Sequence, residues 1–574
     1  MVRKITKPLV AWTLAWSLVA PAHADERQEL LTLKATVVNL VDALVAQGVL
    51  EERAAKALIA KAEKDAQAAE ANSAPAAAVA EGDAAPANGK VVRVPYVPEF
   101  VKQEIREQVR AELREDVLAD VATKAKQERW GTPDALPDWL SRITLYGDAR
   151  VRHQSDLFGD GNADTLSADN LYLDLRAINA AGGITAAGTD AFQNTSIDQH
   201  RWRLRLRPGL RARLGDHWLV DARLSTGNLQ NPVSSNETLG DYGRRADIAI
   251  DRAYIQYHAE NEAGLTWLSL SLGRMPNPFF FTPLVWDEDI NFDGLAGSWV
   301  HYFGDRALGD FGTRRRSLGI TAGLFPVAQV EFTTEDKWLA GGQVHGTWEF
   351  DNQTTVQLAT AFYEYIHETG KRNALGSTLT NTTAPRFLQK GNLMFNIAND
   401  PNLNGGLNDQ LFALASEYRL LNITGAVDLA FLAPYHVLLA ADVVKNFGFD
   451  EDDILRRTGG VTYLYPIKDR TLGWQVEAAV GRPRVGRFAV WQGAQFGDWQ
   501  VGATYRYLQR DAILDAFADS IFHLGGTDAK GYVLHAMFGL AKNVWLRGQY
   551  FSTTEIDGPP FAIDSLQFDL NAAF

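Results

Sequence analysis

The stretch HRWRLRLRPGLRARLGDHWLVDARLSTG, residues 200–227, sorts charged and apolar side chains with a period of two. Successive side chains of a β-strand point to opposite faces, so this strand would have one cationic and one apolar face. A turn at Gly215-Asp216 follows, and the alternation resumes from Trp218. The pattern therefore predicts a β-hairpin. Its basic positions are Arg201, Arg203, Arg205, Arg207, Arg211 and Arg213.

Two folds place such a hairpin differently. In a soluble sandwich the arginines face water and the leucines face a core. In a membrane barrel the leucines face lipid and the arginines face a wet lumen. The hairpin alone does not decide between the two folds. The evidence that does so comes from the rest of the chain.

Composition narrows the function classes. The chain has 574 residues, a formal net charge of -14 and no cysteine. The lack of cysteine excludes a disulfide framework, a thiol nucleophile and a cysteine-based zinc site. The negative charge argues against non-specific nucleic-acid binding. The 15 Trp, 17 Tyr and 28 Phe suit aromatic girdles at two membrane interfaces, and they also suit a large soluble all-β protein.

Residues 1–24 have the three parts of a secretory signal peptide. A basic start is followed by the apolar run Leu9–Ala20 and by the cleavage pattern Ala22-His23-Ala24. Beyond this segment no stretch approaches the roughly 18 apolar residues that a membrane helix needs. A mature chain that spans a membrane must therefore do so as a closed barrel, because only a barrel satisfies its backbone in lipid.

Residues 25–129 are predicted to be mainly helical. Residues 25–71 carry a seam of coiled-coil type, and both a self-associating stalk and a helical hairpin fit it. Residues 72–96, rich in Ala, Pro and Gly, form a flexible linker. Residues 97–129 form a charged amphipathic helix, and residues 130–140 are a short connector.

From residue 141 to residue 574 the chain has the pattern of strands, most of them about 9 to 14 residues long, as tilted membrane strands require. Short turns such as Gly215-Asp216 alternate with long polar loops such as 154–199, which is typical of outer-membrane barrels. We predict an all-β transmembrane antiparallel β-barrel of about 18 strands, with 16 as the alternative. The predicted strands are 142–153, 200–214, 217–226, 248–259, 265–274, 294–303, 316–325, 338–350, 353–366, 419–432, 435–446, 458–466, 471–482, 487–496, 499–510, 529–541, 543–555 and 562–574.

Three further stretches are distinctive: PEFVKQEIREQVRAELRE from Pro98, ERWGTPDALPDWLSRITLYGDARVR from Glu128, and GRMPNPFFFTPLVWDEDINFDGLA from Gly273. Together with the terminal Phe574 they resemble the "putative porin" family of Gram-negative outer membranes. The resemblance implies a β-barrel pore with a periplasmic N-terminal helical region. It also implies that the last strand is the signal read by the barrel-assembly machinery. The apolar residues of that strand include Leu566, Phe568, Leu570 and Phe574.

The segment 275–293 becomes the third external loop when loops are counted from a periplasmic N-terminus. In general porins this loop folds into the lumen and narrows it, so the resemblance invites the same role here. Phe279 and Trp286 could wedge the loop against the wall. The alternative is a loop that only caps the mouth of the barrel. The acidic constriction candidates are Asp287, Glu288, Asp289 and Asp293.

A basic wall would face this loop. It would combine the six arginines of residues 201–213 with Arg150 and Arg152 on the neighbouring strand. Acidic loop and basic wall together would set a transverse field across the pore. The alternative is that the arginines only neutralise acidic lumen residues. Those acids would include Asp148, Asp221 and Asp428.

The predicted function is passive diffusion of small hydrophilic solutes and ions through a water-filled channel in the outer membrane of a Gram-negative bacterium. The alternative is an anchor that tethers this membrane to the cell wall through the N-terminal helices. No phosphate-loop, dinucleotide or zinc-protease motif is present, so we expect no enzyme, no cofactor and no metal. The expected partners are outer-membrane lipid, the barrel-assembly machinery, the cell wall and two further copies in a homotrimer.

Overall fold

The computed structural model describes residues 142–165, 172–262, 264–303, 316–331, 333–350, 353–399, 410–432, 434–482 and 494–574. The predicted signal peptide (1–24), helical segment (25–71), linker (72–96), charged helix (97–129) and connector (130–140) lie outside these residues. Among the described residues, no helix has the length and apolar character needed to cross a membrane.

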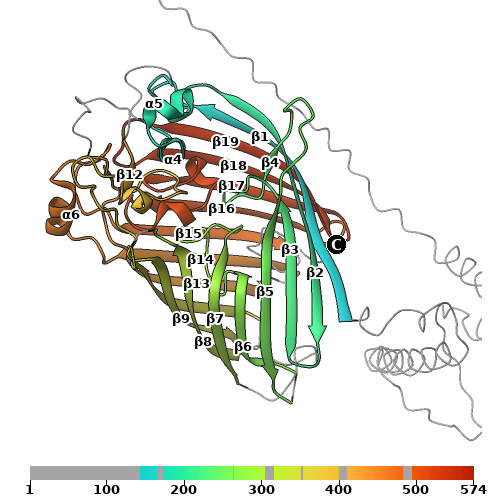
Figure 1. The fold of residues 1–574 in the computed structure, drawn as a ribbon. Helices are drawn as coiled ribbons and strands as arrows, with labels where there is room; N and C mark the ends of the chain where they lie inside the picture. The colour runs from blue at the N-terminus through green and yellow to red at the C-terminus, as the bar shows by residue number, and fades with distance from the viewer. Residues whose placement is uncertain are drawn as a thin grey trace, which may run out of the picture. The chain divides into compact units, whose positions relative to one another are not determined.

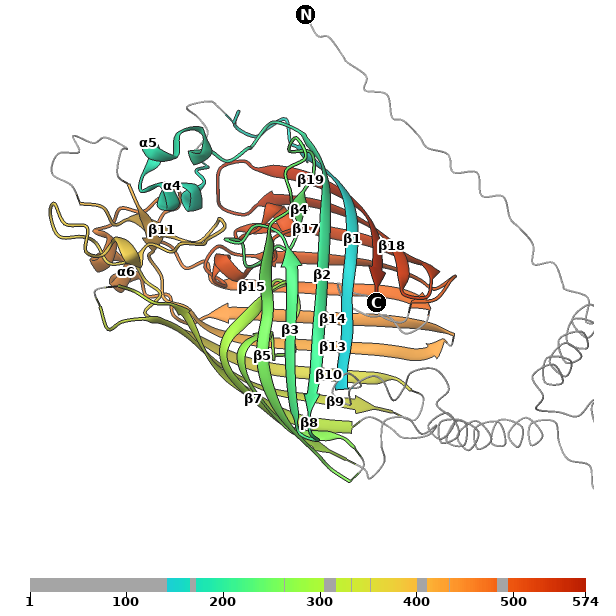
Figure 2. The same ribbon diagram turned by 45° about the vertical axis from the view of Figure 1, so that its right-hand side comes forward.

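Sixteen long strands form one closed antiparallel barrel (Figures 1 and 2). Each strand pairs with the next of the set, and β19 pairs with β1, so the sheet has no free edge. The strands are β1 (Ile143–Phe158), β2 (Gln199–Leu214), β3 (Trp218–Thr226), β5 (Ile248–Glu260), β6 (Thr266–Pro276), β7 (Asn291–Tyr302), β8 (Arg316–Ala328), β9 (Lys337–Glu349), β10 (Thr355–Ile366), β13 (Arg419–Leu432), β14 (Tyr435–Asn446), β15 (Leu472–Arg482), β16 (Trp499–Leu508), β17 (Ala529–Ala541), β18 (Val544–Glu555) and β19 (Ala562–Ala573).

Two of the eighteen predicted strands are absent from the barrel, so the alternative of sixteen is correct. Residues 458–466 begin at the last residue of α6 (Glu451–Thr458) and continue as a loop, in which Tyr463 makes a single bridge to Met394. Residues 494–496 lead into a turn, while 487–493 lie outside the described residues. Because β15 pairs directly with β16, the barrel has no place for a strand between them. Each extra strand would have reversed the direction of the strands after it. Because two were predicted in error, the later turns still lie at the ends of the barrel where they were expected.

Burial along the strands is inverted relative to a soluble protein. On β19, Gln567 and Asp569 are 1% and 3% exposed. Their neighbours Leu566 and Phe568 are 37% and 56% exposed. The predicted alternation is confirmed, with polar side chains inside the barrel and apolar side chains outside. An outer surface of this kind suits hydrocarbon, and a closed ring of strands satisfies the backbone there.

Small elements fill the end of the barrel opposite the short turns. They belong to long connections that fold over and into the lumen. Many of their apolar side chains pack with lumen-facing residues in a large core, and the others form smaller clusters beside it. They are α4 (Leu175–Ala181), α5 (Ile184–Ala187), η3 (Gly188–Ala191), β4 (Glu237–Thr238), η4 (Asn381–Thr383), β11 (Met394–Asn396), β12 (Phe412–Leu414), α6, η5 (Asp515–Phe517) and η6 (Phe522–Leu524). We call this the loop end of the barrel, and the other the turn end.

The first and last strands are joined by side chains as well as by the backbone. Arg152 and Asp569 form a double hydrogen bond inside the barrel, at 2.7 and 2.8 Å, and both are buried. On the outer face the Phe574 ring covers Gly147, and the two residues exchange backbone hydrogen bonds of 2.9 Å. A Cβ at Gly147 would lie 2.6 Å from both the Phe574 ring and the Arg207 carbonyl oxygen.

Gly147→Val should therefore destabilise the barrel at its closing seam, by about 1–3 kcal/mol, the usual cost of overpacking. Urea-induced unfolding in detergent, followed by tryptophan fluorescence, measures the change. Gly342→Val on β9 is the matched control, because a Cβ there meets no atom within 4 Å. Equal stability of the two variants would contradict the proposed seam.

Candidate functional site

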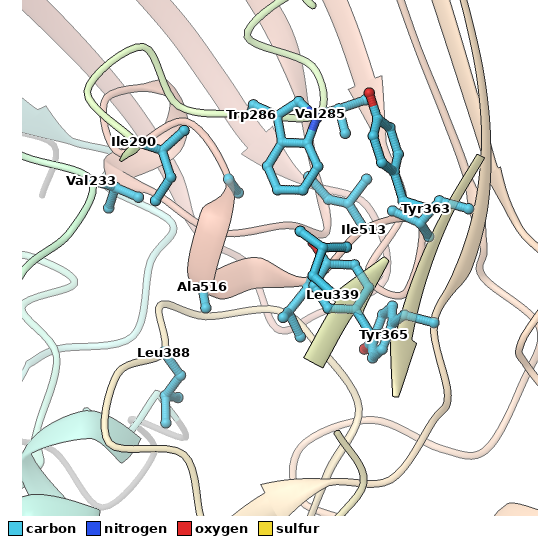
Figure 3. Packing of buried hydrophobic residues seen from close by; sticks show 14 of the residues in the cluster. Val233, Val285, Trp286, Ile290, Leu339, Tyr363, Tyr365, Leu388, Ile513 and Ala516 are labelled. Carbon is cyan, nitrogen blue, oxygen red and sulfur yellow. The ribbon is translucent and has the colours of Figure 1, made fainter. Parts of the chain in front are cut away.

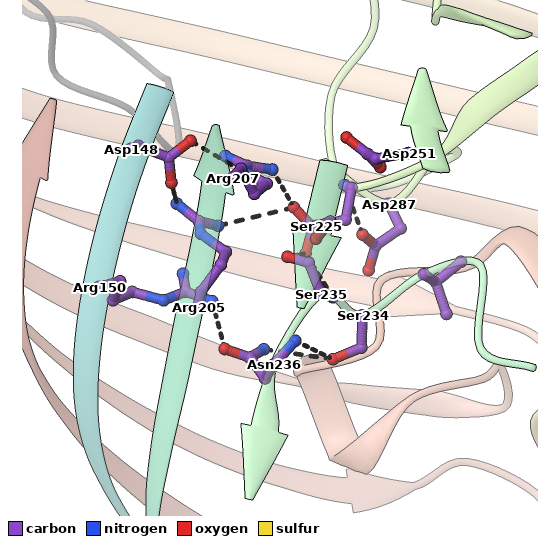
Figure 4. A network of polar contacts seen from close by, with 12 residues as sticks. Asp148, Arg150, Arg205, Arg207, Ser225, Ser234, Ser235, Asn236, Asp251 and Asp287 are labelled. Atoms are coloured by element: carbon purple, nitrogen blue, oxygen red, sulfur yellow. Dashed lines mark hydrogen bonds and ion pairs between the residues drawn. The ribbon is translucent and has the colours of Figure 1, made fainter. Parts of the chain in front are cut away.

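The arginines of β2 share one face of the strand and point into the barrel, where most of them meet a carboxylate. Arg205 and Arg207 both pair with Asp148 of β1, at 2.9 and 2.8 Å (Figure 4). Nearer the turn end, Arg211 pairs with Asp221 at 3.0 Å. Nearer the loop end, Arg201 pairs with Asp156. This part of the wall is therefore largely neutralised.

Two lumen arginines have different surroundings. Arg150 donates to the Asn236 side-chain oxygen at 2.6 Å, and Arg203 donates to that of Gln154 at 3.3 Å. Among the residues that the structure describes, neither arginine forms an ion pair with a carboxylate. Arg213 lies exposed near the turn end and also has no such partner within the described part. Uncompensated positive charge is thus confined to a few positions.

The connection 277–290, between β6 and β7, is docked on the arginine wall. Asp289 accepts from Arg207 at 2.8 Å, and it lies 3.6 Å from Arg205. It also accepts from the backbone N–H and the hydroxyl of Ser235, at 3.1 and 2.7 Å. The acid therefore touches the arginines directly instead of facing them across open space.

The same connection reaches the far side of the barrel. The Phe280 N–H donates to Gln343 of β9 at 2.7 Å, and the Thr282 hydroxyl donates to Asp442 of β14. Eight strands lie between β2 and β14 in one direction around the ring, and six in the other. The connection 277–290 consequently crosses the lumen.

Aromatic side chains hold this crossing connection in place. Trp286 is fully buried, and its ring meets those of Tyr363 and Phe292 at centroid distances of 5.1 and 5.0 Å (Figure 3). Phe279 meets Tyr363 edge-on at 5.1 Å. Such edge-to-face pairs add to the free energy of burial. Phe517 of the 509–528 connection also packs against Trp286, so two connections share one aromatic cluster.

The three adjacent acids of the connection titrate differently. Burial opposes ionisation of Asp289, but the guanidiniums of Arg207 and Arg205 outweigh it and hold its pKa below the ordinary range. Burial, with the negative charges of Asp289 and Asp519, raises the pKa of Asp287. Burial likewise raises the pKa of Glu288. Of the three acids, Asp289 is thus the one whose surroundings favour the ionised form, and it lies against the wall.

Two cavities remain beside the crossing connection. The first, the inner chamber, has an empty volume of about 1010 Å³. The second, the vestibule, has about 1220 Å³ and lies toward the loop end. Asn236, Ser520 and Ile521 line both cavities, so the two spaces lie next to each other at these residues. The charged residues of the inner chamber are Arg150, Arg205, Asp287, Glu288, Asp289, Glu477, Arg506, Asp519 and Arg547.

A family model described as "Putative porin" matches residues 34–574. The chain belongs to this family. The closed barrel with an apolar outer face and a polar lumen is accordingly that of an outer-membrane channel. No protein of the curated set matches its sequence.

Solved outer-membrane channels are similar to this porin over most of their length. OprB of Pseudomonas putida shares 10% identity, with 76% of this chain and 96% of that chain covered and a TM-score of 0.39. The channel DcaP of Acinetobacter baumannii shares 9% identity, with 75% and 97% covered and a TM-score of 0.36. OmpF of Salmonella typhi shares 11%, with 75% and 97% covered and a TM-score of 0.36. Scores of this size do not establish a shared fold, and the assignment rests on the family match.

Two sequence-based expectations need correction. Asp293 is not part of the crossing connection, because β7 begins at Asn291 and its alternation turns Asp293 outward, where it pairs with Arg274 at 2.9 Å. Asp428 lies on β13, across the ring from β2, and it accepts from His436 at 3.0 Å. The other acids, Asp287, Glu288 and Asp289, do line the inner chamber of the porin.

The sequence-based prediction did not include the opposite wall of the inner chamber. It carries Arg506 of β16 and Arg547 of β18, together with amide side chains such as Gln475 and Gln500. Arg506 pairs with Asp519 at 3.0 Å. The alternation in 499–510 and 543–555 places both arginines on the polar face, so the sequence could have predicted that they face the lumen. Among the described residues, no group of three or more metal-ligating side chains comes together.

Asp289→Asn should destabilise the folded porin by on the order of 1–3 kcal/mol at pH 7, because two buried guanidiniums lose a carboxylate. Since the pKa of Asp289 is lowered on folding, its contribution is complete above about pH 4 and is lost as the pH falls through the folded-state pKa. Urea unfolding at a series of pH values should show a difference from the wild type that shrinks in acid. Asp293→Asn, an exposed pair, should change stability by less than about 1 kcal/mol at any pH.

Proposed function

We propose that this barrel is a diffusion porin whose aqueous path runs through the vestibule and the inner chamber, past the connection 277–290. The observation that carries the proposal is the pair of polar cavities that share the lining residues Asn236, Ser520 and Ile521. A path lined by charges and amides passes small hydrophilic solutes and ions, and its narrowest section sets the flux. The connection 277–290 is then the constriction, with Asp287, Glu288 and Asp289 on its lumen side.

In this proposal the field across the inner chamber depends on a few unpaired groups. Arg205 and Asp289 largely cancel one another, being 3.6 Å apart. Arg150 has only an amide partner, and no described residue forms a hydrogen bond or an ion pair with Glu288. Arg547 of the opposite wall also forms no ion pair with a described carboxylate, and its positive charge acts on Glu288. These three groups line the same chamber, so we infer that together they set the sign of ion selectivity.

The N-terminal region would lie in the periplasm, and the mature protein would be a homotrimer folded by the barrel-assembly machinery through the strand that ends at Phe574. Leu566, Phe568 and Leu570 are exposed on the outer face of this strand, which supports the last inference because a recognised side chain must be accessible.

Single-channel recording of the purified full chain in a planar bilayer tests the function. Steady conductance steps are expected. A silent bilayer, with a barrel shown to be folded by its heat-modifiable migration in gels, would contradict the porin proposal and favour the anchoring role.

Glu288→Gln and Arg150→Gln should shift ion selectivity in opposite directions. Loss of the carboxylate should favour anions, and loss of the guanidinium should favour cations, because each variant removes one charge of that sign from the wall of the chamber. The reversal potential in a salt gradient at pH 8, where Glu288 is more fully ionised despite its raised pKa, measures the shift. Asp293→Asn, on the outer face, is the control. Shifts of the same sign would refute this assignment.

A further inference from the structure

The vestibule is a strongly basic space. Its charged lining residues are Arg176, Arg201, Arg203 and Lys390, against a single acid, Asp174. Most of its remaining polar residues are neutral amides, among them Gln154 and Asn236. An anion that enters from the loop end therefore finds a positive potential.

Only one of these four cations lacks a carboxylate within the described residues. Arg201 pairs with Asp156, and Lys390 lies 3.7 Å from Glu555. Arg176 lies 3.9 Å from Asp174.

Arg203 donates instead to neutral oxygens, those of Gln154 at 3.3 Å and Thr238 at 3.5 Å. Both distances are long, so the guanidinium is held weakly. It keeps donors for an incoming carboxylate, which the planar guanidinium binds with two parallel hydrogen bonds.

Aromatic side chains line the same cavity. Phe192 is 39% exposed, and Phe387 is half-buried. Arg176 lies 5.9 Å from the ring centre of Phe387, and Lys390 lies 5.2 Å from that of Phe561. Phe192 is in neither of these cation–π contacts, and its exposed ring offers an apolar surface. The cavity thus joins a weakly held guanidinium to an accessible ring.

We propose that the vestibule is a binding site for small aromatic carboxylates, with Arg203 holding the carboxylate and Phe192 packing on the ring. The vestibule, whose empty volume of about 1220 Å³ includes space open to solvent, is accessible to a molecule of this size from the loop end. This inference rests on the proposed function only for the later passage of the ligand through the chamber. The next guanidinium without a carboxylate partner is Arg150, beyond the shared Asn236, and it would receive the anion from Arg203.

Benzoate is the probe. Isothermal titration calorimetry on the folded full chain in detergent measures binding without any need for conduction. Arg203→Gln keeps a hydrogen-bonding side chain but removes the charge, and it should weaken benzoate binding roughly tenfold to hundredfold. Arg213→Gln makes the same change on the same face of β2 but outside both cavities, and it should leave the affinity unchanged. Benzyl alcohol, with the ring but no charge, should bind weakly to every variant.

A second variant tests the same site independently, in case the Arg203 variant does not fold. Phe192→Ala should weaken benzoate binding several-fold, because the ring contact is lost, and it should leave acetate binding unchanged. Equal benzoate affinity in the wild type and in either site variant would overturn the proposal, as would benzyl alcohol that binds as tightly as benzoate.

Bilayer recording separates this inference from the proposed function. If the channel conducts and benzoate neither blocks the current nor binds, the vestibule site is wrong while the porin function stands. If the bilayer stays silent while calorimetry shows binding that depends on Arg203, the site stands and the diffusion function fails.

Discussion

The pairing of buried arginines with carboxylates inside the barrel is the interaction on which the rest of the structure depends. A strand with an arginine at every second position can face a lumen only if its charges are compensated, since unpaired buried charge is costly. Asp148 and Asp156 of β1 and Asp221 of β3 supply part of this compensation from the wall, and Asp289 adds to it from the connection 277–290. The same ion pairs therefore stabilise the wall and place the connection that divides the lumen.

The lumen of this porin is partly a protein core. Long connections from the loop end bring Trp286 and Phe279 against Tyr363 of β10, and Phe517 packs on Trp286 and on Tyr365. This aromatic cluster closes that side of the barrel. The inner chamber and the vestibule both lie on the side lined by β1, β2 and β15 to β19. Apolar packing sets the shape of the open space, and the polar wall sets its charge.

The fold was largely predictable because strand alternation is local. Residues 200–214 and 562–574 show their two faces in the sequence, and both became barrel strands as predicted. Residues 458–466 were wrongly predicted as a strand because some of their apolar side chains, such as Tyr465, are buried among the connections at the loop end. A run of apolar residues buried in this way looks the same in the sequence as a strand that faces lipid. The acids 287–289 were recognisable, but their docking on Arg205 and Arg207 was not, since a connection that crosses the lumen makes contacts set by the closed ring.

The closing pair of Arg152 and Asp569 joins residues 417 positions apart in the chain. Arg152 is fully buried, so its charge is uncompensated until the last strand arrives. Contacts of such long range form late, because a large loop must close first. Closure of the ring therefore depends on the far end of the chain: a chain that ends before residue 569 would leave Arg152 without this carboxylate at the seam between β1 and β19.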